Sequence, residues 1–395
     1  MNKATRFAFN KYLSRIAELN GIGVSDLANK FSVEPSVTQT LFDKIQQSSS
    51  FLKLINMVTV SELTEEKVGM DVSGSIASTA DTDGGVERKT ADFTKLDAYR
   101  YFCHPVNFDY HLKYNKLDLW ARYQDFQIRI RNAIIKRQAL DYITIGFNGV
   151  SRAATSNRAQ NPLLQDVAVG WLQKYRKDAP ERVMSSITDE DGTVISDTIK
   201  VGKGGHYANL DALVMDAFES LVAEIHRENP EMVVICGRKI LTDKYFPMIN
   251  KFQPNSEQLS GELIISQKTI GQLQAVRAPF FPANSVFITT LDNISIYLYE
   301  DGHRRHIVEN PKLDQVENYE QVKVDFVIED YEAGCLIENI DILEPEEAST
   351  TEASSAEVFA AAMVKAMQAM SPAIAPADSE TPAPADSDNS ANGEA

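Results

Sequence analysis

The sequence predicts an α+β fold in which a long helix lies beside a projecting two-stranded ribbon. Residues 117–145 contain no glycine or proline and carry apolar side chains at helical spacing. Residues 68–112 alternate in hydropathy on both sides of a segment rich in Gly, Ser, Thr and Asp, which is the pattern of a hairpin. The apolar run Met232–Cys236 indicates a buried strand of a separate α/β unit. A chain of 395 residues can form two or more domains around a sizeable core.

The long helix is predicted from Leu117 to Ile145. Its apolar residues recur at steps of three, four or seven, so one face carries Leu119, Tyr123, Phe126, Ile130, Ala133 and Leu140. Gly146 and Gly149 provide the C-terminal stop. At about 1.5 Å per residue the helix is roughly 40 Å long, whereas helices of globular proteins average about eleven or twelve residues. This length suits a strut in a larger assembly better than the wall of an active site.

A basic helical segment is predicted at the N-terminus. Thr5 can cap a helix from Arg6 to about Asn20, and a second short helix follows at Ser25–Lys30. Residues 1–30 hold five basic and two acidic side chains. The pattern fits a docking helix or a segment that is later removed, and it fits equally well an ordinary helix packed on the body.

The ribbon follows a predicted helix at 36–51 and an extended stretch at 51–63. Its first strand is indicated by the alternation at 68–72 and its return strand by the alternation at 99–112. The tip centres on residues 81–85, Asp-Thr-Asp-Gly-Gly. Because two strands alone are marginally stable in water, such a ribbon needs a neighbour on which to lie.

The second half of the chain is predicted to form a compact α/β unit and then to return to strands. Helices are expected at 167–176, 207–227 and 238–249, a hairpin at 186–201, and strands at 232–236, 263–266, 274–278, 286–289, 294–299, 322–328 and 335–343. From Glu344 onward the composition changes to Ala, Ser, Thr, Pro and acidic residues, with ten acidic side chains and one lysine. This tail is expected to be disordered apart from a helix at 353–370.

The composition excludes several classes of function. The net charge of −17 leaves an acidic body, which argues against a broad nucleic-acid surface. Cys103, Cys236 and Cys335 are odd in number and far apart, so they are interpreted as small buried hydrophobes and not as disulfides or zinc ligands. The N-terminus lacks the apolar core of a signal peptide, and no run approaches the ~20 apolar residues of a membrane span.

Motifs of ligand chemistry are incomplete. Val201–Gly205 lacks the spacing of a phosphate loop. Asp81–Gly84 and Asp189–Gly192 lack the glycine and glutamate of a calcium loop. His303 and His306 would share a face on a helix, but no third ligand is near and the two arginines between them would repel a cation. We therefore expect no metal, no cofactor and no catalytic centre.

One surface feature remains. Arg122, Arg129 and Lys136 lie seven residues apart, so they form a basic line along the long helix. They could be a solvated face paired with Asp118 and Asp125. They could also make weak, sequence-independent contacts with nucleic-acid phosphates, or contact an acidic neighbouring subunit.

The order of these elements resembles the major capsid proteins of tailed phages with the Hong Kong 97 fold. Specific stretches are similar to the peduovirus (P-two-like) type of that family, namely Phe31–Thr40, Leu117–Phe126, Ile128–Arg137, Gln165–Tyr175 and Asp330–Cys335. The likeness covers about residues 1–343 and ends at the acidic tail.

The resemblance implies a role for each segment. Residues 1–31 would be an N-terminal segment that engages an internal scaffold-protease and is removed on maturation, with the cut near Phe31 and Ser32. The other segments would be the N-arm (32–63), the extended β-hairpin loop (64–114), the peripheral domain with its spine helix (115–202), the axial domain (203–310), the return strands of the peripheral domain (311–343) and an acidic tail (344–395).

The resemblance also implies a structural protein without catalysis. It would self-assemble into pentamers and hexamers of an icosahedral head shell around phage dsDNA, with the scaffold-protease and the portal protein as partners. Its place would be the virion, after the host cytoplasm, and Arg122, Arg129 and Lys136 would face the DNA. One alternative is an encapsulin-like cargo compartment that keeps its N-terminal segment. A remote one is an α/β enzyme with its site at the strand end Cys236–Gly237.

Overall fold

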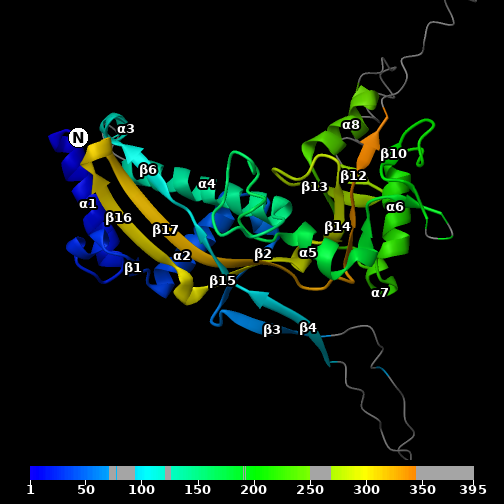
Figure 1. Cartoon of the computed structure of the whole chain (residues 1–395), viewed down its shortest axis with the longest axis horizontal. Helices are drawn as coiled ribbons and strands as arrows, with labels where there is room; N and C mark the ends of the chain where they lie inside the picture. Colours follow the sequence, from blue (N-terminus) through cyan, green and yellow to red (C-terminus); the bar gives the residue numbers. More distant parts are fainter. Residues whose placement is uncertain are drawn as a thin grey trace, which may run out of the picture. The chain divides into compact units, whose positions relative to one another are not determined.

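Strand β17 (Gln315–Ile328) is the centre of the larger of two main sheets, which has seven strands (Figure 1). The computed structural model describes residues 1–70, 77, 94–120, 126–189, 191, 193–249 and 268–343. Antiparallel β15 and β16 share one edge of β17, and β5 and β6 share the other. The bounds of these strands and of the two outer ones are β1 (Phe31–Ser32), β2 (Asn56–Val60), β5 (His104–Asn107), β6 (Tyr110–Lys113), β15 (Ile294–Tyr299) and β16 (Arg304–Asn310).

Three helices pack against the larger sheet, namely α2 (Pro35–Ser48), α4 (Phe126–Asn148) and α5 (Trp171–Asp178). The predicted alternation at 322–328 is confirmed, because Val322, Val324, Phe326 and Ile328 all lie in this core. The helices contribute large side chains to the same core, including Phe42, Ile45, Tyr142, Ile143, Trp171 and Tyr175. This shared core is what fixes the positions of the three helices on the sheet.

The predicted long helix is found as α3 (Tyr114–Trp120) and α4, and residues 121–125 between them lie outside the described residues. Helix α4 extends to Asn148, so its end falls at Gly149 and not at Gly146. The predicted apolar face is wrong in part, because Leu119 is 58% exposed and Ala133 is exposed. The C-terminal half of α4 is instead buried on several faces, through Ala139, Tyr142, Ile143, Ile145 and Phe147. A helix that is buried on several faces does not confine its apolar residues to one face, so the predicted single apolar face does not describe this half of α4.

The smaller sheet has six strands in the order β12-β13-β11-β14-β18-β7. Strand β11 (Met232–Cys236) is buried at all five positions, as its apolar run predicts. The other strands are β7 (Val183–Met184), β12 (Thr269–Ile270), β13 (Leu273–Arg277), β14 (Val286–Thr290) and β18 (Gly334–Ile337). Its core also receives side chains from helices α6 (Leu210–Leu221) and α8 (Arg238–Ile249), and short α7 (Glu224–Arg227) follows α6. The strand predicted at 263–266 lies outside the described residues.

Short elements connect these layers. Strands β8 (Ile187–Thr188) and β9 (Val194–Ser196) form the hairpin predicted after residue 186. Strand β10 (Ile199–Val201) departs from that hairpin and pairs parallel with β19 (Ile340–Ile342). Single turns of 3-10 helix occur at Leu52–Leu54, Pro180–Arg182, Leu291–Asn293, Glu300–Gly302 and Pro311–Leu313.

The two sheets cross the expected domain boundaries. Strands β15 and β16 lie within residues 203–310 but belong to the larger sheet, whereas β7 and β18 lie outside that range and belong to the smaller one. Strands β17 and β18 both lie within residues 311–343 and join different sheets. Strand partners are chosen by contacts distant in sequence, which hydropathy patterns do not report, so the membership of a sheet does not follow segments of the sequence.

The ribbon consists of β3 (Thr64–Met70) and β4 (Thr94–Phe102), an antiparallel pair with no third strand among the described residues. The pairing ends at Phe102, although the sequence led us to expect the ribbon to continue to residue 114. The next two strands, β5 and β6, return to β17. The tip at 81–85 lies outside the described residues.

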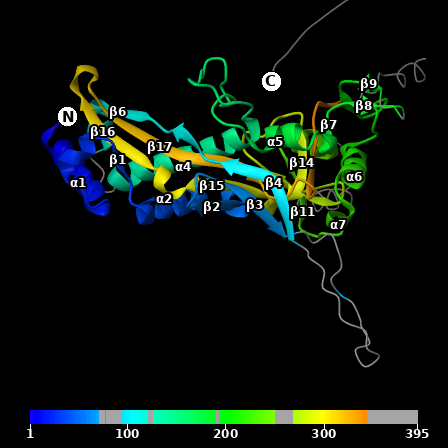
Figure 2. The same ribbon diagram turned by 60° about the horizontal axis from the view of Figure 1, so that its bottom comes forward.

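The N-terminal elements lie at the end of the larger sheet, beside β16 and β6 (Figures 1 and 2). Helix α1 (Lys3–Leu19) begins earlier than predicted, because the side chain of Asn2, and not that of Thr5, is the cap. The Asn2 Oδ1 accepts the backbone N–H of Thr5 at 2.8 Å. The second helix is a 3-10 helix, η1 (Val24–Ala28).

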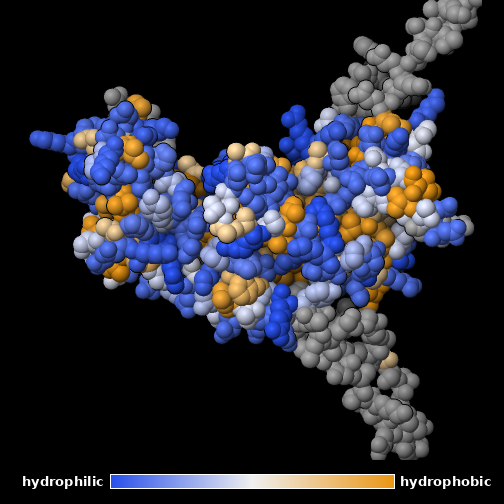
Figure 3. Space-filling model, in the orientation of Figure 1, coloured by the Kyte–Doolittle hydropathy of each residue, from blue (hydrophilic) through white to orange (hydrophobic). Residues whose placement is uncertain are grey.

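Polar residues dominate the face shown in Figure 3, with hydrophobic residues in small separate patches. Exposed apolar side chains of the described chain include Phe7, Leu119, Val194, Ile195, Met215 and Phe280. Among the described residues, no helix is long and apolar enough to span a bilayer.

Candidate assembly surfaces

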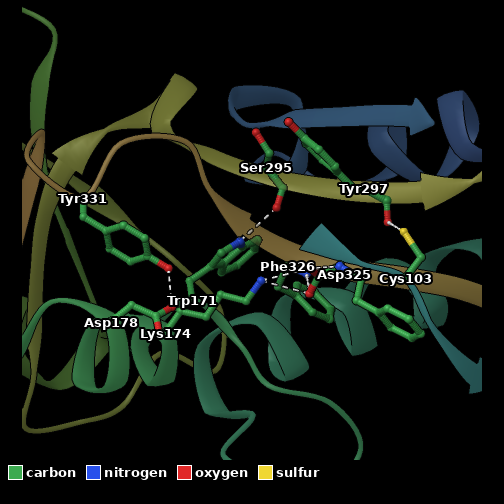
Figure 4. A network of polar contacts seen from close by, with 10 residues as sticks. Cys103, Trp171, Lys174, Asp178, Ser295, Tyr297, Asp325, Phe326 and Tyr331 are labelled. Atoms are coloured by element: carbon green, nitrogen blue, oxygen red, sulfur yellow. Dashed lines mark hydrogen bonds and ion pairs between the residues drawn. The ribbon is translucent and has the colours of Figure 1, made fainter. Parts of the chain in front are cut away.

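The ribbon is attached to the body at its base through Asp325, a residue of β17 that is only 8% exposed (Figure 4). Its Oδ2 accepts the backbone N–H of Phe102, the last residue of β4, at 3.1 Å. Both carboxylate oxygens lie 3.0 Å from Nζ of Lys174, on α5. One carboxylate therefore joins the end of the ribbon, the central strand and a covering helix.

Aromatic contacts support the same junction. The rings of Tyr101 in β4 and Tyr297 in β15 meet edge to face, with centroids 5.0 Å apart. Burial, followed by the neighbouring Glu65 carboxylate, raises the pKa of Tyr101 to about 12, so its hydroxyl stays protonated. Cys103 is buried beside them, with its Sγ 3.8 Å from the carbonyl oxygen of Tyr297 (Figure 4).

Trp171 positions the helix that carries Lys174. Its indole is fully buried, donates from Nε1 to the carbonyl oxygen of Ser295 at 3.0 Å, and meets the ring of Phe326 edge to face (Figure 4). Gly146 of α4 makes room for this ring, since a Cβ there would lie 2.2 Å from Cζ3 of Trp171. The indole thus holds α5 against β15 and β17, so that Lys174, one turn later, reaches Asp325.

This geometry suits a contact with another molecule better than it suits catalysis. The ribbon is held at its base, and its two strands pair only with each other within the described residues. Unpaired strand edges and exposed faces are stabilised by further contacts. The residues of this junction were not predicted from the sequence. One feature could have indicated them, namely the acidic Asp325 within the apolar alternation at 322–328.

The N-terminal segment forms a second surface, in which an apolar cluster joins α1 and η1 to the body. Phe9, Ile16 and Leu27 are buried in it. The body contributes Leu117 from α3, Ile130 from α4, Ile307 from β16 and Val316 from β17. The segment predicted to be removed is therefore packed on the larger sheet.

The predicted processing bond lies in β1. Phe31 and Ser32 pair antiparallel with Arg305 and Arg304 of β16, and the side chain of Ser32 is exposed. The backbone N–H of Val33, the next residue, donates to the carbonyl oxygen of His303 at 3.0 Å. The bond thus lies at an exposed sheet edge but within a hydrogen-bonded strand.

The predicted basic line is described only in part. Arg129 and Lys136 are exposed on α4, whereas Arg122 lies outside the described residues. Helix α4 carries two further exposed arginines, Arg131 and Arg137, which do not follow the seven-residue spacing and were not predicted. Arg137 forms an ion pair with Asp141 at 2.6 Å. The basic surface of α4 is thus broader than a single line.

The remaining candidates have structural roles. His303 is buried, with Nδ1 3.0 Å from Thr38 Oγ1 and Nε2 2.9 Å from Glu320 Oε1. The carbonyl oxygen of Ala28 lies 2.8 Å from Nε2 of His306. The two histidines lie before and within strand β16, not on a helix, and the described residues contain no group of three or more ligands able to hold a metal.

The cysteines and the glycine-rich loop also lack reactive geometry. Burial raises the pKa of Cys236 to about 12, which leaves a protonated thiol and disfavours a nucleophile at this strand end. Cys103 and Cys335 are likewise free and buried, as predicted. Residues 201–205 form a turn with Gly202 and Gly204 at φ 133° and 80°, and α6 begins only at Leu210.

Comparison with known proteins agrees with this structural role. Residues 8–340 match the family described as phage major capsid protein, P2 family. The chain is 62% identical over 342 residues to a protein of Escherichia phage P2 named "Capsid proteins", covering 87% of this chain and 96% of that protein. It is 42% identical over 353 residues to the major capsid protein of Serratia phage KSP20, covering 88% and 99%.

A solved structure resembles the fold closely. The solved structure is the satellite phage P4 procapsid including its size determination protein. One chain of it matches this chain with a TM-score of 0.72 and 58% sequence identity. The match covers 87% of this chain and 99% of that one, and it confirms the predicted α+β fold of Hong Kong 97 type. The family match includes both sheets, the base of the ribbon and most of the N-terminal segment. Because the members of this family are structural capsid proteins, the match excludes the enzyme alternative. The chain belongs to the P2 family of phage major capsid proteins, and its role in the virion is structural.

Proposed function

We propose that the chain assembles into pentamers and hexamers of an icosahedral head shell that encloses phage dsDNA. The observation that supports this most is the ribbon β3–β4, which is fixed to the body at its base by Asp325 and has no third strand among the described residues. A neighbouring copy would supply the contacts that a two-stranded ribbon needs. The smaller sheet with α6 and α8 would meet its copies around the five-fold and six-fold positions.

Electron microscopy tests the assembly directly. The full chain is co-expressed with the internal scaffold-protease, and the particles are purified and imaged. We expect closed shells of uniform size, and the chain expressed without the scaffold is the control for guided assembly. Only small soluble oligomers in both cultures would refute the proposal.

The internal scaffold-protease would engage residues 1–31 and cut near Phe31 and Ser32. The outward side of α1 supports such a contact, because the exposed side chains Lys3, Phe7 and Lys11 lie four residues apart. Phe7 is 75% exposed between two cations, which fits an acidic amphipathic partner helix. The portal protein would be the further partner of the same shell.

Intact mass of the shell protein distinguishes this proposal from a cargo compartment. Loss of about thirty residues from the N-terminus is expected for a processed phage head, where the family resemblance places the cut. Shells in which every copy keeps residues 1–31, although the protease is active on a known substrate, would favour the encapsulin-like alternative.

Arg122, Arg129 and Lys136 would contact packaged DNA through weak phosphate interactions. Two of them, Arg129 and Lys136, are exposed on α4, and exposed cations attract phosphates without reading sequence. The triple change to Gln should lower DNA retention and increase its loss at raised salt. A matched triple change of exposed lysines elsewhere, Lys53, Lys200 and Lys312 to Gln, should not. Shells of altered size in the first variant would contradict this role.

A further inference from the structure

The surface that holds α1 is a defined apolar site, which we call the N-terminal seat. It consists of Leu112, Leu117, Ile130, Ile307 and Val316, contributed by five different elements. Phe9 of α1 enters it and is only 3% exposed, whereas Phe7, two residues earlier, is 75% exposed. The helix is therefore bound through one face only.

Polar contacts join the same segment to the body at several points along its length. The backbone nitrogen of Asn2 donates to Oδ1 of Asp118 at 3.0 Å. Arg6 forms an ion pair with Glu309 of β16. Near the other end of the segment, the carbonyl oxygen of Ala28 lies 2.8 Å from Nε2 of His306. None of these contacts depends on the peptide bond between residues 31 and 32.

We infer that residues 1–31 remain bound in the N-terminal seat after that bond is cut, so that excision and departure are separate steps. This inference rests on the proposed processing near Phe31 and Ser32. Cutting the bond removes the covalent link but leaves the apolar cluster and the polar contacts in place. Departure would expose the apolar side chains of the seat to water, which opposes spontaneous release.

The fit between Phe9 and the seat is not complete. A gap of about 20 Å³ remains beside Phe9, enough for about one water molecule. Asn318 lines this gap, and among the described residues its buried Nδ2 has no hydrogen-bond acceptor. An unsatisfied buried amide weakens the packing relative to a fully satisfied core. The packing around Phe9 is therefore less complete than that of a fully satisfied core.

A full chain with a recognition sequence for a site-specific protease inserted between Lys30 and Phe31 tests the inference. Lys30 is exposed and precedes β1, so the insertion falls outside α1, η1 and β1. After complete cutting, the mixture is separated by size exclusion in native buffer and, as a reference, in denaturant. We expect the N-terminal peptide to co-elute with the body in native buffer and to separate from it in denaturant.

Paired substitutions show whether the seat is responsible. Phe9→Asp should weaken the cut complex at least about tenfold, because it places a charge in an apolar site. Phe7→Asp, the same change on the exposed face, should leave it unchanged. Arg6→Gln should speed dissociation about two- to fivefold through the lost pair with Glu309, whereas Arg15→Gln, whose partner Glu18 is in α1 itself, should not.

Either of two results overturns the inference. The peptide of the unaltered chain could elute alone in native buffer, or Phe7→Asp could release it as strongly as Phe9→Asp. The test uses neither the scaffold nor assembled shells. A failure here is therefore distinguishable from a failure of the proposed shell function, which electron microscopy and intact mass measure independently.

Discussion

Asp325 accepts the backbone N–H of Phe102 at 3.1 Å, and this hydrogen bond ties the last residue of the ribbon to the central strand of the larger sheet. The same carboxylate pairs with Lys174 and accepts the backbone N–H of Phe326 at 2.9 Å. In the proposed shell, a ribbon that lies across a neighbouring copy would need a defined direction from its own subunit. The junction around Asp325 fixes the base of the ribbon to the body through a charged, nearly buried group.

Asp325→Ala should destabilise the fold and loosen the ribbon. Removing one partner of a buried pair costs about 3–5 kcal/mol, and it also leaves the N–H of Phe102 without its acceptor. Denaturant unfolding measures the first effect, and hydrogen exchange at the Phe102 amide measures the second. Both the free energy of unfolding and the protection of this amide should fall.

Lys174→Met is the matched comparison for the Asp325 variant. The carboxylate then loses its cation but still accepts from Phe102 and Phe326. The amide of Phe102 should stay protected although stability falls. Equal loss of protection in the two variants would show that the hydrogen bond does not hold the ribbon.

Gly146→Ala should strongly impair folding of the helical layer. The added Cβ would lie 2.2 Å from Cζ3 of the fully buried Trp171, and overpacking of a core costs about 1–3 kcal/mol or more. Asn132→Ala, at an exposed position on the same helix, should stay within about 0.5 kcal/mol of the parent. Thermal unfolding compares the two, and equal midpoints would rule out the proposed clash.

Glu320 should contribute to stability against acid. Burial by itself raises the pKa of this carboxyl, but the guanidinium of Arg305 and the hydrogen bond from His303 outweigh burial and lower the pKa to about 2. A depressed pKa in the folded state stabilises above the unfolded value of about 4.3, and this stability is lost as the pH falls toward 2.

The measurement for Glu320 is the denaturant midpoint as a function of pH. Glu320→Gln should lower the midpoint at pH 7, because Arg305 and His303 lose their charged partner. Between pH 4.3 and 2 the midpoint of the variant should fall less steeply than that of the parent. Parallel curves over this interval would assign the acid sensitivity to other groups.

The three cysteines should be unreactive in the folded chain. Burial raises the pKa of Cys103, Cys236 and Cys335 to about 12 each, so at pH 8 the thiols stay protonated. A colourimetric thiol reagent should detect almost no reaction until denaturant exposes all three. Because these pKa values are raised by folding, their stabilising contribution is complete below about pH 9 and is lost as the pH rises toward 12. A fast-reacting thiol in the native protein would contradict the burial.

Residue type and spacing predicted some elements correctly but did not fix where others begin or end. The run Met232–Cys236 indicated a buried strand, because it is short and rich in β-branched residues, and the structure confirms β11 with all five residues buried. The start of α1 was misplaced because Asn2 and Thr5 are both acceptable caps. The return half of the ribbon was extended too far because alternation looks the same in β4, β5 and β6.

The sequence by itself determined the α+β class, the long helix, the ribbon, the buried strands and, through specific stretches, the family. The class and the elements depend on short-range periodicity and residue type, whereas the family was identified by the resemblance of those stretches to a known family. Only the tertiary structure decided that β5 and β6 pair with β17, that Asp325 joins the ribbon to α5, and that α1 occupies an apolar seat. Such contacts join residues as far as 303 positions apart in the case of Arg6 and Glu309, and their energies depend on which surfaces meet.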